Sequence, residues 1–438
     1  MAVSPAPEFN ADAVSALPGP AWLRSSRLAS WERFQSAGRP SQSEEIWRYS
    51  RIDEFDPERY QPCPPEATGE TGLPQLPGDV RRLVAAAGPG ATVLVSHNGG
   101  HGQVLQPQPG LQVGPADGPL LAEDVRPSGG GPGPDAWTAL NGAFVAVPWR
   151  VTVAPGADVE RPLVVVHWLD GDGSAAFPRL EVQLGEGSAL KMLEVIASPG
   201  TDILAVPLAR LVVPEGARLG FGHVQLLGGK AWQLGNQVSQ VGRDASLRSM
   251  TVALGGYYAR VRTDSVLDGP GGDSELMAAY FGREDQMHDL RTVQLHAAPR
   301  SRSNLLFKGA VAERAHSVYS GLIRVEKGAK GTNALQTNRN LVLSEGAQAD
   351  SVPNLEIEDN DVRCSHASAV GPIDESQLFY LESRGLPTRT AERLIALGFM
   401  DDVLERFPVG GVLPWLRGAL ANRLTGAGFG GAMTEAGP

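Results

Sequence analysis

The pattern of apolar and polar positions repeats through the middle of the chain. Short apolar runs follow turn-like segments, and within a run the two classes alternate, as Ile323 and Val325 do with Arg324 and Glu326. Alternation with a period of two is typical of strands. The turn-like segments recur every 28 or 29 residues, with equivalent positions at Gly187, Gly216, Asp244, Gly272, Arg300 and Gly328.

A repeat of this length and chemistry predicts a β-solenoid, in which each coil buries a face against the next coil. A second series of breaker residues falls about midway through each period, so we expect two strands in each coil. We therefore predict a mainly β protein with a right-handed parallel β-helix as its core. A β-sandwich is the rival architecture, because turns spaced about fourteen residues apart also suit antiparallel strands.

Helical patterns lie on both sides of this repeat. Residues 21–35 place most of their large apolar side chains on one side of a helix that Gly38 and Pro40 should end, and the next segment offers Ile46, Trp47 and Tyr49 as anchors. After the repeat, Asp374 with Gln377 predicts a helix start, and Gly385 a helix end. We expect a second helix from Thr388 to Leu397, closed by Gly398, and two further short helices.

These patterns divide the chain into four parts. Residues 1–75 are expected to form an N-terminal helical region, and 76–150 a connecting region that is rich in Pro and Gly, densest between Gln106 and Asp135. Residues 151–372 should form the β-helix core. Residues 373–438 should form a C-terminal helical region that is too small to be an independent domain and must pack on the solenoid or on a partner.

Composition narrows the possible functions. The 438 residues carry a net charge of −11 and no block of Lys or Arg, which argues against a nucleic-acid partner. No run of about 18 apolar residues predicts a membrane span, and the first residues lack the pattern of a signal peptide. We expect a soluble cytoplasmic protein. The two cysteines give no disulfide framework, in agreement with a reducing compartment.

The candidate chemistry lies where the repeat ends, at Cys364 and His366. Residues two apart on a strand point to the same face, so a thiol and an imidazole should lie together there. Both are ligands that iron and iron–sulfur clusters accept. However, the only other cysteine is Cys63, about three hundred residues away, and a cluster needs about four ligands. A cluster site on this chain therefore has to be shared with another chain or occupied only transiently.

Several motifs in this region carry a resemblance to a known family. They are HSVYSGLIRVEKGAKGTNALQTNRNLVLSEGAQADSVPNLEIEDNDVRCSHAS, then GPIDESQLFYLESRGL and AERLIALGF, with EEIWRYS near the N-terminus. In this order they resemble the SufB/SufD family of iron–sulfur cluster assembly proteins. The resemblance is strong over residues 290–405, recognisable at 44–50 and weak between Gln61 and Gly185.

Within the family, the chain resembles the SufD branch, because Asn338 stands where SufB has its sulfur-accepting cysteine. The resemblance implies a non-catalytic scaffold subunit that pairs with SufB and binds the SufC ATPase. It also implies that His366 helps to hold a transient cluster shared with SufB. Cys364, two residues away, is a second candidate ligand from its spacing alone, and an inert thiol in the core is the alternative for it. No phosphate-binding loop with the G-x-x-x-x-G-K-[ST] spacing is present, so nucleotide hydrolysis should belong to SufC.

The family further implies that SufC docks on the C-terminal helical region, about Asp374 to Phe407. The apolar residues expected to contribute are Leu378, Phe379, Tyr380, Leu394 and Phe399.

Other readings remain open from the sequence. The chain could be a SufB-like paralogue, or a polysaccharide-active β-helix enzyme, although the repeat brings no acids and bases to equivalent coil positions. A hexapeptide-repeat acyltransferase would need a six-residue period that the sequence lacks. An unpaired solenoid edge also permits a homodimer of the isolated chain. His296 and His316 are expected to be structural, and Cys63 receives no role.

Overall fold

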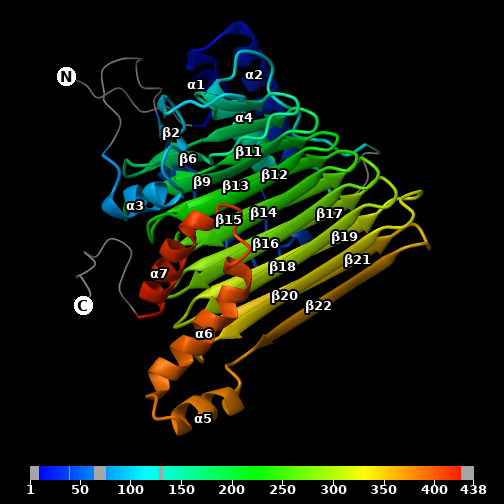
Figure 1. Ribbon diagram of the computed structural model, residues 1–438. Coiled ribbons are helices and arrows are strands. Elements are labelled where there is room, and N and C mark those ends of the chain that lie inside the picture. Colours follow the sequence, from blue (N-terminus) through cyan, green and yellow to red (C-terminus); the bar gives the residue numbers. More distant parts are fainter. Residues whose placement is uncertain (1–8, 39, 64–74, 128–131, 426–438) are drawn as a thin grey trace, which may run out of the picture.

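The computed structural model describes residues 9–38, 40–63, 75–127 and 132–425. Two long sheets run side by side through the molecule, and from β11 (Leu208–Val213) onward each strand pairs with the strand two places ahead in the chain (Figure 1). Nearly all of these pairs are parallel, as between β12 and β14 (Arg218–Leu226 and Ser246–Ala253). The chain therefore winds from one sheet to the other and back in each coil, which confirms the predicted β-solenoid and excludes the sandwich.

The first sheet has twelve strands within the described residues. Its main path, from the C-terminal edge inward, consists of β21 (Gln348–Ile357), β19 (His316–Val325), β17 (Met287–His296), β15 (Tyr258–Leu267), β13 (Trp232–Val241), β11 (Leu208–Val213), β8 (Arg179–Leu184), β5 (Pro148–Val153) and β4 (Leu111–Pro115). Three short strands lie off this path, namely β1 (Gln61–Pro62), β7 (Ser174–Ala176) and β10 (Ile203–Ala205).

The second sheet has ten strands in the same part of the chain. In spatial order they are β22 (Arg363–Gly371), β20 (Asn333–Val342), β18 (Arg302–Val311), β16 (Asp273–Gly282), β14, β12, β9 (Ala189–Ala197), β6 (Leu163–Trp168), β2 (Thr92–His97) and β3 (Gly102–Leu105). Only β2 with β3 and β4 with β5 pair antiparallel, so the N-terminal edge of each sheet ends in an antiparallel strand.

The turns between coils explain the sequence period. Gly187, Gly216, Asp244 and Arg300 all adopt a positive φ, between +50° and +67°, at the positions that the repeat marks as equivalent. Glycine reaches this backbone region without strain, whereas Asp244 and Arg300 adopt it at a small cost. Gly328 also has a positive φ, of +94°, and in the coil of Gly272 the preceding Gly271 adopts this conformation, so the period in the sequence follows a turn geometry that recurs at or next to the equivalent positions.

Helices cover the outer face of each sheet. The N-terminal helices α1 (Ala11–Ala16), α2 (Ala21–Ala37) and α4 (Ala136–Phe144) join the core on the outer face of the twelve-stranded sheet, together with short 3₁₀ turns. The helix predicted at residues 21–35 is confirmed, and Gly38 ends it. Trp47 is buried with the Arg260 guanidinium 4.3 Å from its ring centre, whereas Ile46 and Tyr49 are exposed and are not the anchors that the sequence predicted.

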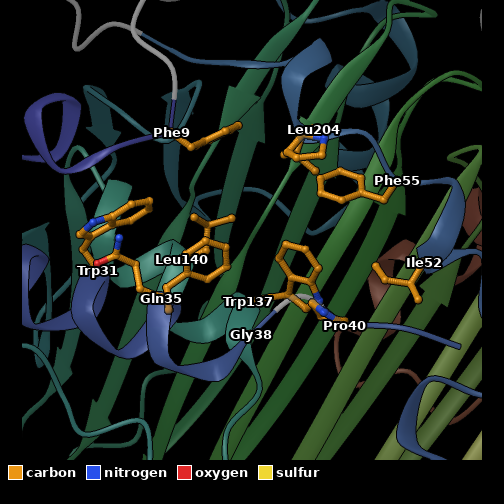
Figure 2. A pocket seen from close by; sticks show the side chains of 12 residues that line it. Phe9, Trp31, Gln35, Gly38, Pro40, Ile52, Phe55, Trp137, Leu140 and Leu204 are labelled. Atoms are coloured by element: carbon orange, nitrogen blue, oxygen red, sulfur yellow. The ribbon is translucent and has the colours of Figure 1, made fainter. Parts of the chain in front are cut away.

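The same N-terminal region encloses an aromatic cavity of about 340 Å³. Figure 2 shows Trp31, Phe55 and Trp137 around it, with Leu204 from the solenoid on one side. The helices α2 and α4, which contribute Trp31 and Trp137 to this cavity, lie at the end of the molecule opposite to β22.

The outer face of the ten-stranded sheet is covered by α3 (Gly78–Ala86), α6 (Thr388–Leu404) and α7 (Leu413–Leu424). Here α6 continues through Gly398, and the prediction that Gly398 ends this helix is wrong. A glycine inside a helix costs about 1 kcal/mol. The buried Met400, Val403 and Leu404, which pack against the sheet beyond it, outweigh that cost.

Residues 76–150 are more ordered than a connecting region. They contain α3, α4 and strands of both sheets, and β2 pairs in parallel with β6. The solenoid therefore begins before residue 151. The Pro- and Gly-rich sequence does not indicate these strands, because a strand as short as β2 obtains its stability from its neighbour and not from its own composition.

Candidate functional site

The last coil of the solenoid leaves one edge of each sheet open. In the described part of the chain, β21 pairs only with β19, and β22 pairs only with β20. The helix α5 (Glu375–Ser383) follows β22 but lies beyond it and does not cover it (Figure 1). Such edges present unpaired backbone N–H and C=O groups, which form a template for a strand from another chain.

Cys364 and His366 lie on this open strand, and both belong to the set of β22 residues that face the solenoid interior. Cys364 lies beside the buried Ala334 of β20, and His366 lies beside the buried Gln336. Cys364 is half-buried and packs against the small cluster around Ile323, whereas His366 is exposed at the open end. The structure thus brings the two predicted ligands together at the mouth of the solenoid.

Burial raises the pKa of the Cys364 thiol, so it stays protonated at neutral pH in the isolated chain. A thiolate is the form that binds metal. Among the residues that the structure describes, no group of three or more His, Cys, Asp or Glu side chains converges to hold a metal ion. Within the described residues the open end offers a thiol and an imidazole, and no third side chain of these types joins them.

The other two histidines considered from the sequence are held by hydrogen bonds. His316 Nε2 lies 2.6 Å from Asp350 Oδ2. His296 is fully buried, and its two ring nitrogens lie 2.7 and 2.8 Å from the hydroxyls of Ser301 and Ser303. These contacts support the structural roles predicted for both. Cys63 lies apart from the site, half-buried against a separate apolar cluster.

Asn338 faces the interior two residues beyond Gln336. Its Nδ2 donates to Tyr280 Oη at 3.1 Å, and the Tyr280 hydroxyl donates to Asn340 Oδ1 at 2.6 Å. Asn340 Nδ2 in turn donates to Asn338 Oδ1 at 2.8 Å. Asn338 is therefore a buried structural amide in a closed set of hydrogen bonds and offers no nucleophile.

The sequence did not single out Gln336. This side chain is 1% exposed, and neither its amide oxygen nor its amide nitrogen has a hydrogen-bond partner among the described residues. Buried polar groups are nearly always paired, so the exception needs a reason. The strand alternation could have assigned Gln336 to the interior, but not the absence of a partner.

A second surface lies on the C-terminal helices. Phe379, Tyr380 and Leu394 are 71%, 57% and 47% exposed. Leu378 is half-buried, and Phe399 packs toward the solenoid with the Lys308 ammonium 4.7 Å from its ring centre. Three of the five residues expected to dock a partner thus form an exposed apolar surface on α5 and α6.

Within the described chain, no helix is both long and apolar enough to cross a membrane.

Comparison with known proteins covers both the open end of the solenoid and the exposed apolar surface on α5 and α6. Residues 167–399, which hold the main run of coils and both open strands, match the sequence model described as the SufBD core domain of the SUF iron–sulfur cluster assembly system. The chain belongs to the SufBD family. The resemblance seen in the sequence is therefore confirmed, and it extends from the motifs near β22 back to residue 167.

Individual relatives agree with this assignment. A SufBD family iron–sulfur cluster assembly protein of Mycobacterium tuberculosis is 36% identical over 298 residues, which are 66% of this chain and 73% of the relative. The iron–sulfur cluster assembly protein SufD of Bacillus subtilis is 29% identical over 280 residues, 63% of this chain and 64% of the relative. SufD of Escherichia coli is 28% identical over 283 residues, 63% of this chain and 67% of the relative.

Proposed function

We propose that this member of the SufBD family is a SufD-type scaffold subunit that does no chemistry of its own. In this role it pairs with a SufB-type subunit through the open end of its solenoid. It binds a SufC-type ATPase through its C-terminal helices. It contributes His366, with Cys364 beside it, to a cluster shared between the two solenoids. The observation that carries the proposal is the open edge of β22, the strand that presents both side chains.

The number of donors at the open end favours a shared site. An iron–sulfur cluster takes about four ligands, and Cys364 with His366 can provide two. The half-buried thiol has to lose its proton before it can bind iron, whereas the exposed His366 imidazole is accessible without any rearrangement. We therefore assign the main role to His366.

Backbone chemistry favours strand pairing at the same place. The N–H of Arg363 donates to Thr332 of the preceding coil. By the alternation of a parallel ladder, every second residue of β22 points its N–H toward β20, and the residues between them, among them His366 and Ser368, point theirs to the open edge. A strand of a second solenoid can accept these hydrogen bonds and extend the sheet.

The test of the cluster role is anaerobic reconstitution of the complete SufB–SufC–SufD-type complex with His366→Ala. The matched control is Ser368→Ala, which alters an exposed side chain on the same face of the same strand. We expect His366→Ala to lower the visible absorbance and the lifetime of the cluster, and Ser368→Ala to leave both unchanged. Equal cluster yields and lifetimes in the two variants would refute the ligand role.

The test of the pairing uses the backbone at the same residue. Ser368→Pro removes an N–H that faces the open edge, whereas Ser368→Ala keeps it. In binding assays with the SufB-type subunit, we expect the proline variant alone to weaken the association. Unchanged affinity of the proline variant would contradict the edge-to-edge arrangement.

The ATPase contact is tested on the exposed helical surface. Removing the whole C-terminal region would also expose the core beneath α6 and α7, so point substitutions are the sharper test. We expect Phe379→Ala combined with Tyr380→Ala to weaken binding of the SufC-type ATPase. Leu105→Ala, which truncates an exposed apolar residue on β3 at the N-terminal edge, is the control and should bind normally.

A further inference from the structure

Gln336 lies directly behind the open strand. It belongs to β20, and its register partner on β22 is His366. Both residues face the solenoid interior, as do their neighbours Ala334 and Cys364. Only the last coil separates Gln336 from the open end. The side chains that separate it from the open end therefore belong to that coil, and among them His366 is its direct register partner.

The opposite sheet leaves room for this amide. Gly321 of β19 lies across the interior, and any side chain at that position would collide with the Gln336 amide nitrogen and with the Tyr319 hydroxyl. The Tyr319 hydroxyl is hydrogen-bonded to Thr292, at 3.1 Å, and does not satisfy the amide. The solenoid thus encloses a polar side chain in a fitted space without giving it a hydrogen-bond partner.

We propose that Gln336 is a positioning residue for His366. In the structure Gln336 Oε1 has no partner among the described residues; in the proposed arrangement the His366 ring turns toward it, Oε1 accepts a hydrogen bond from Nδ1–H, and the lone pair of Nε2 is left directed to the open end, where the cluster iron would be bound. Nδ1 is assigned to Gln336 because it lies on the backbone side of the ring, nearer to the neighbouring strand, whereas Nε2 lies at the tip. This inference rests on the ligand role proposed for His366.

The tautomer of His366 decides which of its ring nitrogens can bind a metal. A neutral imidazole carries one proton, and a metal can bind only the nitrogen that lacks it. A free histidine side chain favours the proton on Nε2, which is the wrong nitrogen for an outward-facing ligand. Ligand histidines in metal sites almost always donate their other N–H to a carbonyl or carboxylate, and this contact fixes the tautomer and the ring orientation. Gln336 can supply that carbonyl within the same chain.

The test is a nitrogen NMR spectrum of the full-length chain labelled with ¹⁵N-histidine, with His366 assigned by its loss in His366→Asn. In the unsubstituted chain at a pH where the ring is neutral, we expect His366 to be mainly the Nδ1–H tautomer. In Gln336→Met, which keeps the volume but removes the amide, we expect mainly Nε2–H. Gln336→Glu keeps an acceptor oxygen and should restore Nδ1–H.

The matched control is Gln294→Met. Gln294 is also fully buried, and neither of its amide atoms has a partner in the described residues, but it lies on β17 and not behind His366. It should leave the His366 spectrum unchanged, whereas a general loosening of the solenoid would alter the spectrum in both variants. A His366 ring that is mainly Nε2–H in the unsubstituted chain would overturn the proposal, even if Gln336→Met does not fold.

A second measurement separates this proposal from the function on which it rests. Loss of a group that orients a metal ligand typically lowers metal affinity by about 10- to 100-fold. We expect the reconstituted complex with Gln336→Met to lose iron faster by a factor in this range. A normal tautomer shift, combined with normal iron retention in both Gln336→Met and His366→Ala, would leave the positioning contact valid and refute the ligand role of His366.

Discussion

His296 makes the stability of the solenoid dependent on pH. This last residue of β17 is completely buried between two serine hydroxyls, and burial lowers the pKa of its imidazole from 6.5 to about 4. The unfolded chain, in contrast, takes up a proton at this residue near pH 6.5. Below that pH the unfolded state binds more protons than the folded state, so stability falls as the pH is lowered from 6.5 toward 4.

The size of the effect follows from the two pKa values. Between pH 7 and pH 5, the difference in proton uptake at His296 corresponds to about 2 kcal/mol of unfolding free energy. His288 is buried in a similar way, and its pKa is likewise lowered to about 4, mainly by desolvation. The two histidines together should therefore cost the folded chain about 4 kcal/mol over this interval.

The assay is urea unfolding at pH 7 and pH 5, followed by circular dichroism. His296→Gln should show about 2 kcal/mol less loss of unfolding free energy between the two pH values than the unsubstituted chain. The control Gln294→Met changes a buried polar residue on the same strand without adding or removing a titrating group, and its pH dependence should equal that of the unsubstituted chain. An equal loss in His296→Gln and the unsubstituted chain would refute the reasoning.

Three further predictions concern other buried groups. Burial alone would raise the pKa of Glu194, but the His167 imidazole, with Nε2 3.5 Å from Glu194 Oε1, and the hydrogen bond between His223 Nδ1 and Glu194 Oε2 outweigh it and lower the pKa to about 2. Glu194→Gln should therefore lose about 3 kcal/mol of unfolding free energy at pH 7, and this variant should not show the loss of stability that protonation of Glu194 causes between pH 4.5 and pH 2. Phe407→Ala should cost about 3–5 kcal/mol in urea unfolding, because the buried ring fills the space above Gly222. With Cys63 replaced by Ser, Cys364 should react with iodoacetamide more slowly at pH 7 than a cysteine introduced at the exposed Ser368.

The solenoid was predictable from the sequence because its determinants are local. Each coil needs a turn with a positive φ, and Gly187 and Gly216 mark two of these turns. Asp244 and Arg300 hold the same backbone geometry without being glycines, so the spacing of the repeat identified them and the residue type did not. Alternation within the strands then supplied the two faces of each sheet.

The remaining errors arose where tertiary contacts outweigh local preference. Gly398 has the sequence character of a helix end, yet the residues that follow it reach the outer face of the ten-stranded sheet and keep the helix intact. Strand β2 lies in a stretch that is rich in Gly and Pro, and it forms because β6 pairs with it. No single-sequence pattern contains the partner on which these elements depend.

In the candidate site, too, some features follow from local strand geometry and others depend on tertiary contacts. The spacing of Cys364 and His366 was enough to predict that they share a face, because that depends only on strand geometry. The position of Gln336 behind His366 depends on the register between β20 and β22, which is set by the length of β21 and of the turns on either side of it. Its unmet hydrogen bonds depend in addition on the space left by Gly321 across the interior.

The contact between α3 and α7 has a consequence for how the chain folds during synthesis. Most contacts within the solenoid join one coil to the next, so coils can form in sequence as they leave the ribosome. The helix α7, however, follows the last coil in the chain and packs on α3, which precedes most of the coils. The part of the outer face of the ten-stranded sheet that α6 and α7 cover therefore stays exposed until these helices have been made, and during this interval the nascent chain most needs protection from aggregation.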